Sequence, residues 1–186
     1  MTLALTASNE FKQDLKGVIW ITGLSGSGKT SLANKLRSIY LENGLITIQL
    51  DGDELRGVLG NSDSYDRVSR LSVGKIYSRL AWLLASQGHI VIVSAIALFH
   101  EVHLYNRQFS NYCEIYLSAD QKQLAEDNRK SIYARDGSPN QNVVGVDLEP
   151  EFPKSPHRVI QDCPNSLSEI DINELYSLTL TFMSKD

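Results

Sequence analysis

Eight residues near the start of the chain have the types and spacing of a loop that wraps around phosphate groups. They read Gly23-Leu-Ser-Gly-Ser-Gly-Lys-Thr30 and stand between an apolar run at 18–21 and a helical pattern. Glycines let the backbone approach phosphate oxygens, and amides at the following helix N-terminus point at the anion. In such a loop the lysine reaches the β- and γ-phosphates and the Thr hydroxyl binds Mg²⁺. The expected nucleotide-binding residues are Gly23, Ser25, Gly26, Ser27, Gly28, Lys29 and Thr30. A flexible Gly/Ser turn is the alternative, which the strand, loop and helix order disfavours.

Two carboxylates follow the second apolar stretch, at 46–50. They are Asp51 and Asp53, in the order Asp-Gly-Asp. Ligands of parallel sheets bind at the carboxyl ends of the strands, so these carboxylates would lie beside the phosphate loop. There they can orient Mg²⁺ through water and accept a proton from an attacking hydroxyl, as a small-molecule kinase requires. A motor or transporter ATPase would instead end an apolar strand in an acidic residue, and the strand at 90–93 is followed by Ser94. A polar turn between strand and helix is the alternative interpretation of the pair.

Three arginines follow the carboxylates. Arg56 lies three residues after Asp53, and Arg67 and Arg70 lie one helical turn apart at the start of a helical pattern. A spacing of three places Arg67 and Arg70 on one helix face, where both can bind an anionic acceptor. A solvated basic face is the alternative.

Short apolar runs alternate with helical periodicities along the chain, which is typical of a parallel sheet covered on both faces. Strands are expected at 17–22, 46–50, 90–93, 113–117 and 158–160. Further helices are expected near 100–109 and 120–129, and after the capping-box pattern at 166–169. A long helix at about 66–87 is expected to bury Val68, Leu71, Ile76, Leu80, Leu83 and Leu84. We predict an α/β fold, a P-loop NTPase-like kinase with a five-stranded parallel sheet and helices on both faces. One domain spans residues 1–186, with residues 1–12 as an N-terminal extension.

Composition excludes several classes of function. The chain has 186 residues, 42% of them hydrophobic, which suffices for a core without metal or disulfide. A net charge of −4 argues against a nucleic-acid partner and leaves phosphate recognition to a few placed basic groups. No apolar run approaches membrane-spanning length, so no membrane partner is expected. Cys113 and Cys163 have neither zinc nor framework spacing, which indicates reduced thiols and a cytoplasmic protein.

Over about residues 16 to 161 the chain resembles the adenylyl-sulfate kinases. The resemblance is carried, in matching order, by Gly23-Leu-Ser-Gly-Ser-Gly-Lys-Thr30, Leu50-Asp-Gly-Asp53 with Arg56, Asp66-Arg67, Val93-Ser-Ala-Ile96, Lys130-Ser-Ile-Tyr133 and Gly145-Val-Asp147. It implies transfer of the γ-phosphate of ATP, with Mg²⁺, to the ribose 3′-hydroxyl of a nucleotide whose 5′ end bears a mixed anhydride. The family's usual assembly is a homodimer, which no residue pattern in this chain indicates by itself.

The resemblance also implies roles for individual residues. Asp51 would be the general base, with Lys29 on the transferred phosphate and Asp53 supporting Mg²⁺ together with Thr30. The residues implied to bind the acceptor are Asp53, Arg56, Arg67, Arg70, Ile96, Lys130 and Val143.

Departures from the family pattern concern the acceptor. The family's Phe-Ile-Ser-Pro is Ala95-Ile-Ala-Leu98 here, and its Asn after Asp-Arg is Arg70. Two family phenylalanines that sandwich adenine correspond to Val143 and to Asn61 or Ser62. Each lost aromatic removes about 1–3 kcal/mol of base stacking. In Tyr65-Asp-Arg-Val-Ser-Arg70 and Asn142-Val-Val-Gly-Val-Asp147 the chain resembles a divergent branch that includes cytidine diphosphoramidate kinases, and that acceptor is favoured. A true adenylyl-sulfate kinase and a nucleotide-binding module with little activity remain alternatives, whereas shikimate and gluconate kinases lack this combination of motifs.

A lid over the nucleotide is expected at about 128–147. Asp127 and Asn128 stand where the family has an Arg-Asp pair, so the usual lid arginine is missing from its own position. Arg129, or else Arg135, would bind the nucleotide in place of the usual lid arginine.

Overall fold

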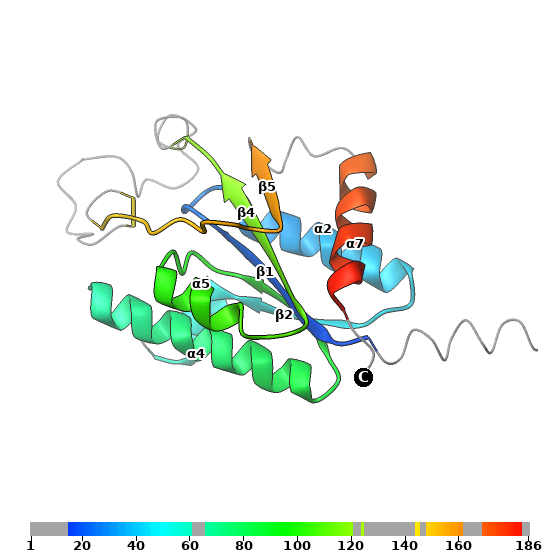
Figure 1. Ribbon diagram of the computed structural model, residues 1–186, viewed down its shortest axis with the longest axis horizontal. Coiled ribbons are helices and arrows are strands. Elements are labelled where there is room, and N and C mark those ends of the chain that lie inside the picture. Colours follow the sequence, from blue (N-terminus) through cyan, green and yellow to red (C-terminus); the bar gives the residue numbers. More distant parts are fainter. Residues whose placement is uncertain are drawn as a thin grey trace, which may run out of the picture.

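The computed structural model describes residues 15–60, 66–120, 124, 144–145, 148–161 and 169–183. Five parallel strands form one sheet in the order β2-β3-β1-β4-β5 (Figure 1). The strands are β1 (Gly17–Gly23), β2 (Thr47–Asp51), β3 (Ile90–Ser94), β4 (Tyr112–Ser118) and β5 (Arg158–Gln161). Because all strands are parallel, their carboxyl ends share one edge of the sheet, and the predicted fold class is confirmed.

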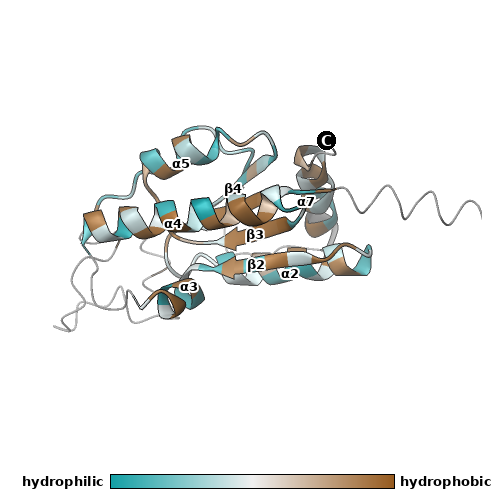
Figure 2. Ribbon diagram, turned by 90° about the horizontal axis from the view of Figure 1, so that it is seen from below, coloured by the Kyte–Doolittle hydropathy of each residue, from teal (hydrophilic) through white to brown (hydrophobic). Residues whose placement is uncertain are grey.

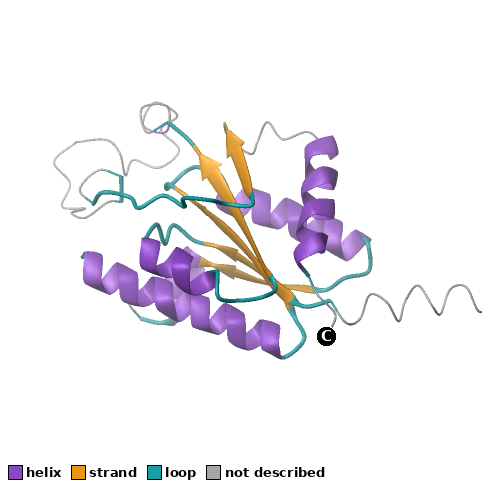
Figure 3. Ribbon diagram, in the orientation of Figure 1, coloured by secondary structure: helices purple, strands orange, loops and turns teal. Residues whose placement is uncertain are grey.

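Helices cover both faces of this sheet. Helices α2 (Lys29–Glu42) and α7 (Glu169–Phe182) pack on one face, and α4 (Arg67–Ser86) and α5 (His100–Asn106) on the other (Figures 1 and 3). The short helix α3 (Gly52–Val58) follows β2 directly. Within the described residues, no helix combines the length and the apolar character that crossing a membrane requires.

The central strand β1 is buried on both faces, which explains its unbroken apolar sequence. Ile19 and Ile21 belong to the core under α2 and α7, whereas Val18 and Trp20 belong to the core under α4 and α5. This alternation follows from the two-residue period of a strand. In the view of Figure 2, brown apolar residues line β2, β3 and the adjoining side of α4. The chain therefore has two apolar layers separated by the sheet.

The predicted buried face of α4 is only partly correct, because Leu71, Leu80 and Leu84 pack against the core but none of the six predicted residues is fully buried. Val68 and Leu83 are 74% and 53% exposed, and Leu71, Ile76, Leu80 and Leu84 are only partly buried. The residues that the helix buries fully are Val73, Gly74, Tyr77, Ser78, Ala81 and Ala85, and all of them except Tyr77 are smaller than leucine. A Cβ on Gly74 would lie 3.1 Å from Cγ2 of Val102 in α5, so the close approach of the two helices requires small side chains. The largest apolar residues therefore lie beside the contact rather than in it.

Several other expectations can be compared with the structure. The expected helix at 100–109 ends at Asn106, and Cys113 is buried and free as predicted. Leu124 is helical and its amide donates to the carbonyl of Asp120 at 3.0 Å. The rest of the expected helix at 120–129, the N-terminal extension, the capping box and Cys163 lie outside the described residues.

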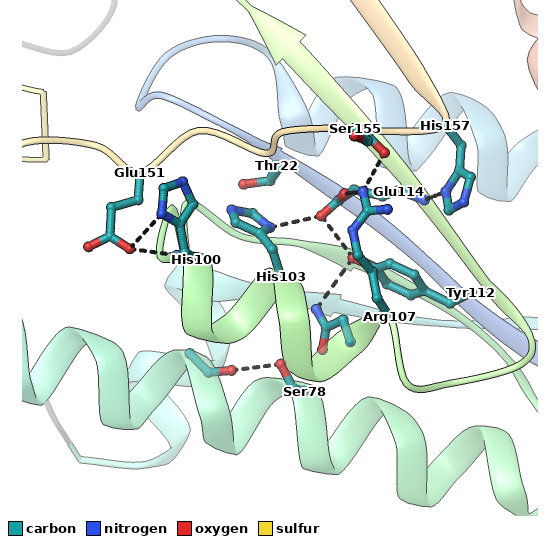
Figure 4. Close-up of polar contacts among 12 residues, drawn as sticks. Thr22, Ser78, His100, His103, Arg107, Tyr112, Glu114, Glu151, Ser155 and His157 are labelled. Carbon is teal, nitrogen blue, oxygen red and sulfur yellow. Dashed lines mark hydrogen bonds and ion pairs between the residues drawn. The ribbon is translucent and has the colours of Figure 1, made fainter.

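A buried carboxylate, Glu114 of β4, anchors α5 to the sheet (Figure 4). It accepts hydrogen bonds from Nδ1 of His103 at 2.8 Å, a guanidinium nitrogen of Arg107 at 2.5 Å and the hydroxyl of Tyr112 at 3.0 Å. Its backbone amide donates to Nδ1 of His157 at 2.8 Å. Burial raises the pKa of the Glu114 carboxyl, but the hydrogen bonds and charges of His103 and Arg107 outweigh it, and the net shift is downward. The carboxylate is therefore ionised and satisfied in the folded chain.

Replacing Glu114 with Gln should lower the free energy of unfolding by about 1–3 kcal/mol at pH 7, because the buried network loses the carboxylate that accepts from His103, Arg107 and Tyr112. Since the folded-state pKa lies below the ordinary value of 4.5, this stabilisation is complete above that pH and is lost as the pH falls through the folded-state pKa. Urea unfolding at a series of pH values measures both effects.

Glu174→Gln is the matched control, because Glu174 forms an exposed ion pair with Arg158 at 3.2 Å. Such a pair contributes about 0–1 kcal/mol. A Glu114→Gln variant as stable as this control would contradict the anchoring role.

Candidate active site

The phosphate loop joins the end of β1 to the start of α2. Gly26 and Gly28 have φ angles of 80° and 87°, in the left-handed region that favours glycine. A Cβ on Gly23 would lie 2.6 Å from the carbonyl oxygen of Leu117, so the strand end also needs glycine. The Nζ of Lys29 donates to the carbonyl of Leu24 at 2.6 Å, across the loop. The loop thus has the curled backbone that presents amides at the start of α2 to an anion.

Asp51, at the end of β2, connects the end of β3 to the starts of α2 and α3. One carboxylate oxygen accepts from the hydroxyl of Thr30 at 2.7 Å and from that of Ser94 at 2.8 Å. The other accepts from the amide of Asp53 at 2.9 Å, which caps helix α3. Burial raises the pKa of the Asp51 carboxyl, but the hydrogen bonds from Thr30, Ser94 and the backbone outweigh it, and the net shift is downward. The Asp51 carboxylate is therefore ionised and is fixed in place by three hydrogen bonds.

The oxygens of Thr30 and Asp51 form a donor set that suits Mg²⁺. Magnesium prefers hard oxygen ligands and binds through one or two carboxylates together with phosphates and water. The Thr30 hydroxyl and the Asp51 carboxylate are 2.7 Å apart, and Lys29 of the loop immediately precedes Thr30. The residues present therefore fit the ion that the phosphate loop predicts.

A cavity of about 250 Å³ extends from the phosphate loop over the ends of β2 and β3. The predicted site residues that line this cavity are Ser25, Gly26, Gly28, Lys29, Thr30, Asp51, Asp53, Arg56, Arg70 and Ile96. Asp53 is exposed in the first turn of α3. The cavity therefore holds the expected phosphate, carboxylate and arginine groups together.

Three predicted residues lie in the described structure but not on the cavity wall. Gly23 ends β1, and Ser27 is 2% exposed beneath the loop. Arg67 pairs with Glu151 and lies over the ring of Phe99, with 5.5 Å between its guanidinium carbon and the ring centroid. The one-turn spacing did place Arg67 beside Arg70 on α4, but only Arg70 lines the cavity.

Sequence reasoning gave no site role to two residues that build the site. Ser94 holds Asp51, and Tyr77 adds an aromatic wall to the cavity, which Phe99 also lines. Burial raises the pKa of Tyr77, whose hydroxyl donates to the carbonyl of Gly52 at 2.9 Å. The register of β2 with β3 places Asp51 beside Ser94, and the strand order would have been the signal for that pair.

Other predictions concern residues outside the described part of the chain. These are Arg129, Arg135, Lys130, Val143, the positions Asn61 and Ser62, and most of the expected lid. Val144, which follows one of them, is 4% exposed and lines the cavity. The lid and its arginine stay predictions.

Known proteins resemble this chain along most of its length. A family model described as adenylylsulphate kinase matches residues 16–161. A cytidine diphosphoramidate kinase of Campylobacter jejuni is 39% identical over 154 residues, or 82% of this chain and 90% of that protein. A probable adenylyl-sulfate kinase of Aeropyrum pernix is 30% identical over 167 residues, or 87% and 91%. The structure of the Mycobacterium tuberculosis APS kinase CysC in complex with AMPPNP and APS has a TM-score of 0.78 at 28% identity, over 88% of this chain and 97% of that chain. The matched region contains every residue that lines the cavity.

Replacing Lys29 with Ala should reduce ATP turnover by at least about 10²-fold, because the loop loses the charge that meets the transferred phosphate. Circular dichroism should show an unchanged fold, since Lys29 is not part of the core. Arg37→Ala, an exposed cation on the same helix, is the matched control. Full turnover in a folded Lys29→Ala variant would contradict the phosphate-loop assignment.

Proposed function

The chain belongs to the adenylylsulphate kinase family and is a phosphotransferase with a hydroxyl acceptor, and we propose that its acceptor is the ribose 3′-hydroxyl of a nucleotide conjugate. The observation that carries this proposal is the single cavity in which Lys29, Asp51 and Asp53 meet Arg56 and Arg70. A phosphate loop alone would serve many reactions. Arginines beside the carboxylates add a place for a second anion, which an acceptor with a charged 5′ group supplies.

Cytidine diphosphoramidate is the favoured acceptor. The similarity to the Campylobacter jejuni kinase, at 39% identity, supports it. Arg70 and Arg56 in the cavity match an anionic 5′ group by charge and by hydrogen-bond geometry, which suits the diphosphate-type group of this acceptor and equally the phosphosulfate of adenylyl sulfate.

Adenylyl sulfate is the second candidate, and one observation favours it. Phe99 and Tyr77 line the cavity, so aromatic surface remains available to a purine although the two family phenylalanines are absent. The kinase of Aeropyrum pernix shows that proteins named for adenylyl sulfate are also similar to this chain.

The contacts of the two carboxylates support a division of labour between them. Asp51, with a lowered pKa and three hydrogen bonds, is suited to hold Mg²⁺ and its waters with Thr30. When bound, Mg²⁺ would neutralise charge on the β- and γ-phosphates. Asp53 is exposed in the same cavity and is suited to accept the proton of the acceptor hydroxyl. This proposal exchanges the roles that the family resemblance implied for the two residues.

Asp53→Asn should lower kcat by roughly 10²- to 10⁴-fold, because the amide cannot accept the proton. Asp51→Asn should mainly raise the Mg²⁺ concentration needed for half-maximal rate. Initial rates over a Mg²⁺ titration separate the two effects, and Glu54→Gln, an exposed neighbour off the cavity wall, is the control. A large fall in kcat for Asp51→Asn with a mild effect for Asp53→Asn would return the base to Asp51.

Coupled assays of ADP release should give a higher kcat/KM for cytidine diphosphoramidate than for adenylyl sulfate. The two acceptors are compared side by side with the same enzyme and saturating ATP. A preference for adenylyl sulfate would assign the chain to the second candidate. ADP release that ignores both acceptors would contradict the proposed reaction.

A further inference from the structure

Glu151 lies in the segment 148–161 that leads into β5, and it connects three separate elements. One carboxylate oxygen accepts from the guanidinium of Arg67 at the start of α4. The other accepts from the amide of His100 at the start of α5, at 2.6 Å (Figure 4). The amide of Glu151 donates to the carbonyl of Leu98 at 3.0 Å. One residue therefore secures the chain on both sides of Phe99.

Phe99 is held from two directions by these contacts. It is the N-cap of α5 and provides no side-chain cap, so the Glu151 carboxylate satisfies the amide of His100 instead. The Arg67 guanidinium, fixed by the same carboxylate, lies 5.5 Å from the centroid of the Phe99 ring. Phe99 is 4% exposed and lines the cavity together with Ile96 and Ala97.

The contacts require an ionised carboxylate. Burial raises the pKa of Glu151, but the hydrogen bond from His100 and the charge of Arg67 outweigh it, and the net shift is downward. Glu151 is therefore charged at neutral pH, and an amide in its place would lose the attraction to Arg67.

The cavity is shared between two ligands in the proposed function. The phosphates of ATP belong at the loop of residues 25–31, so the remaining wall, which includes Phe99, Tyr77 and Gly74, faces the acceptor. Phe99 is thus a contact surface for the acceptor rather than for ATP.

We propose that Glu151 is a positioning residue for the acceptor: through Arg67 and the amide of His100 it fixes Phe99 as a rigid wall of the acceptor site. This inference rests on the proposed function. It also gives Arg67 a different role from Arg56 and Arg70, since Arg67 supports the wall while the other two meet the anion.

An ion pair between α4 and α5 gives a matched control. Lys75 and Glu101 are joined at 2.6 Å on the surface, and neither lines the cavity. Glu101→Gln, like Glu151→Gln, therefore removes a carboxylate that pairs with a basic residue of α4, but Glu101 does not line the cavity.

Steady-state kinetics with the full chain tests the proposal. Glu151→Gln should raise KM for the acceptor by roughly tenfold to a hundredfold, the range expected for a misplaced binding wall. KM for ATP should stay unchanged, and Glu101→Gln should leave both constants unchanged. Because Arg67 and Glu151 act as one unit, Arg67→Met with Glu151→Gln should be no worse than the more damaging single change.

An acceptor-independent measurement accompanies the kinetics. In the wild-type chain the Phe99 ring should shift the Nε–H resonance of Arg67 in the NMR spectrum, and this shift should be lost in Glu151→Gln and in Phe99→Leu. A shift retained in Glu151→Gln, or equal increases of KM for ATP and acceptor, would overturn the positioning role. A wild-type chain that turns over neither acceptor would instead overturn the proposed function, and this outcome is distinct because it appears without any substitution.

Discussion

The hydrogen bonds of Asp51 hold the catalytic edge of the sheet together. Thr30 at the start of α2, Ser94 at the end of β3 and the amide of Asp53 at the start of α3 all donate to this one carboxylate. Parallel strands bring their ends to a common edge, but they do not by themselves fix the side chains that follow them. Asp51 supplies that constraint, because the phosphate loop after β1 and the acidic turn after β2 are joined through it. The cavity exists where these two segments meet.

The opposite wall of the cavity depends on α5, which has only seven residues. A helix this short gains little stability from its own backbone hydrogen bonds. Two carboxylates from other elements stabilise α5. Glu114 binds His103 and Arg107 near the end of the helix, and Glu151 binds the amide of His100 at its start. The helix is therefore fixed at both ends by residues of other elements. Phe99, immediately before it, acquires a defined place in the cavity.

Local patterns in the sequence predicted some features well and others poorly. The five strands and the phosphate loop are contiguous segments, and each was recognised from its own residues. The predicted face of α4 was only partly correct, because hydrophobicity marks large side chains, whereas the close contact with Val102 of α5 requires a residue as small as Gly74. The spacing of Arg67 and Arg70 correctly placed both on one side of a helix, yet a spacing cannot show that Glu151 holds Arg67 away from the cavity.

The sequence by itself determined the fold class, the phosphate loop and the carboxylate pair, because glycines at left-handed positions and apolar periodicity express their chemistry within a few neighbouring residues. Only the tertiary structure decided which distant residues complete the site. Ser94 meets Asp51 across 43 positions of sequence, and Glu151 meets Arg67 across 84. Such contacts depend on the strand order and on how closely α4 and α5 pack. The strand order and the helix packing are set by how all the strands and helices bury their apolar faces in a common core. A single segment of the chain does not carry that information.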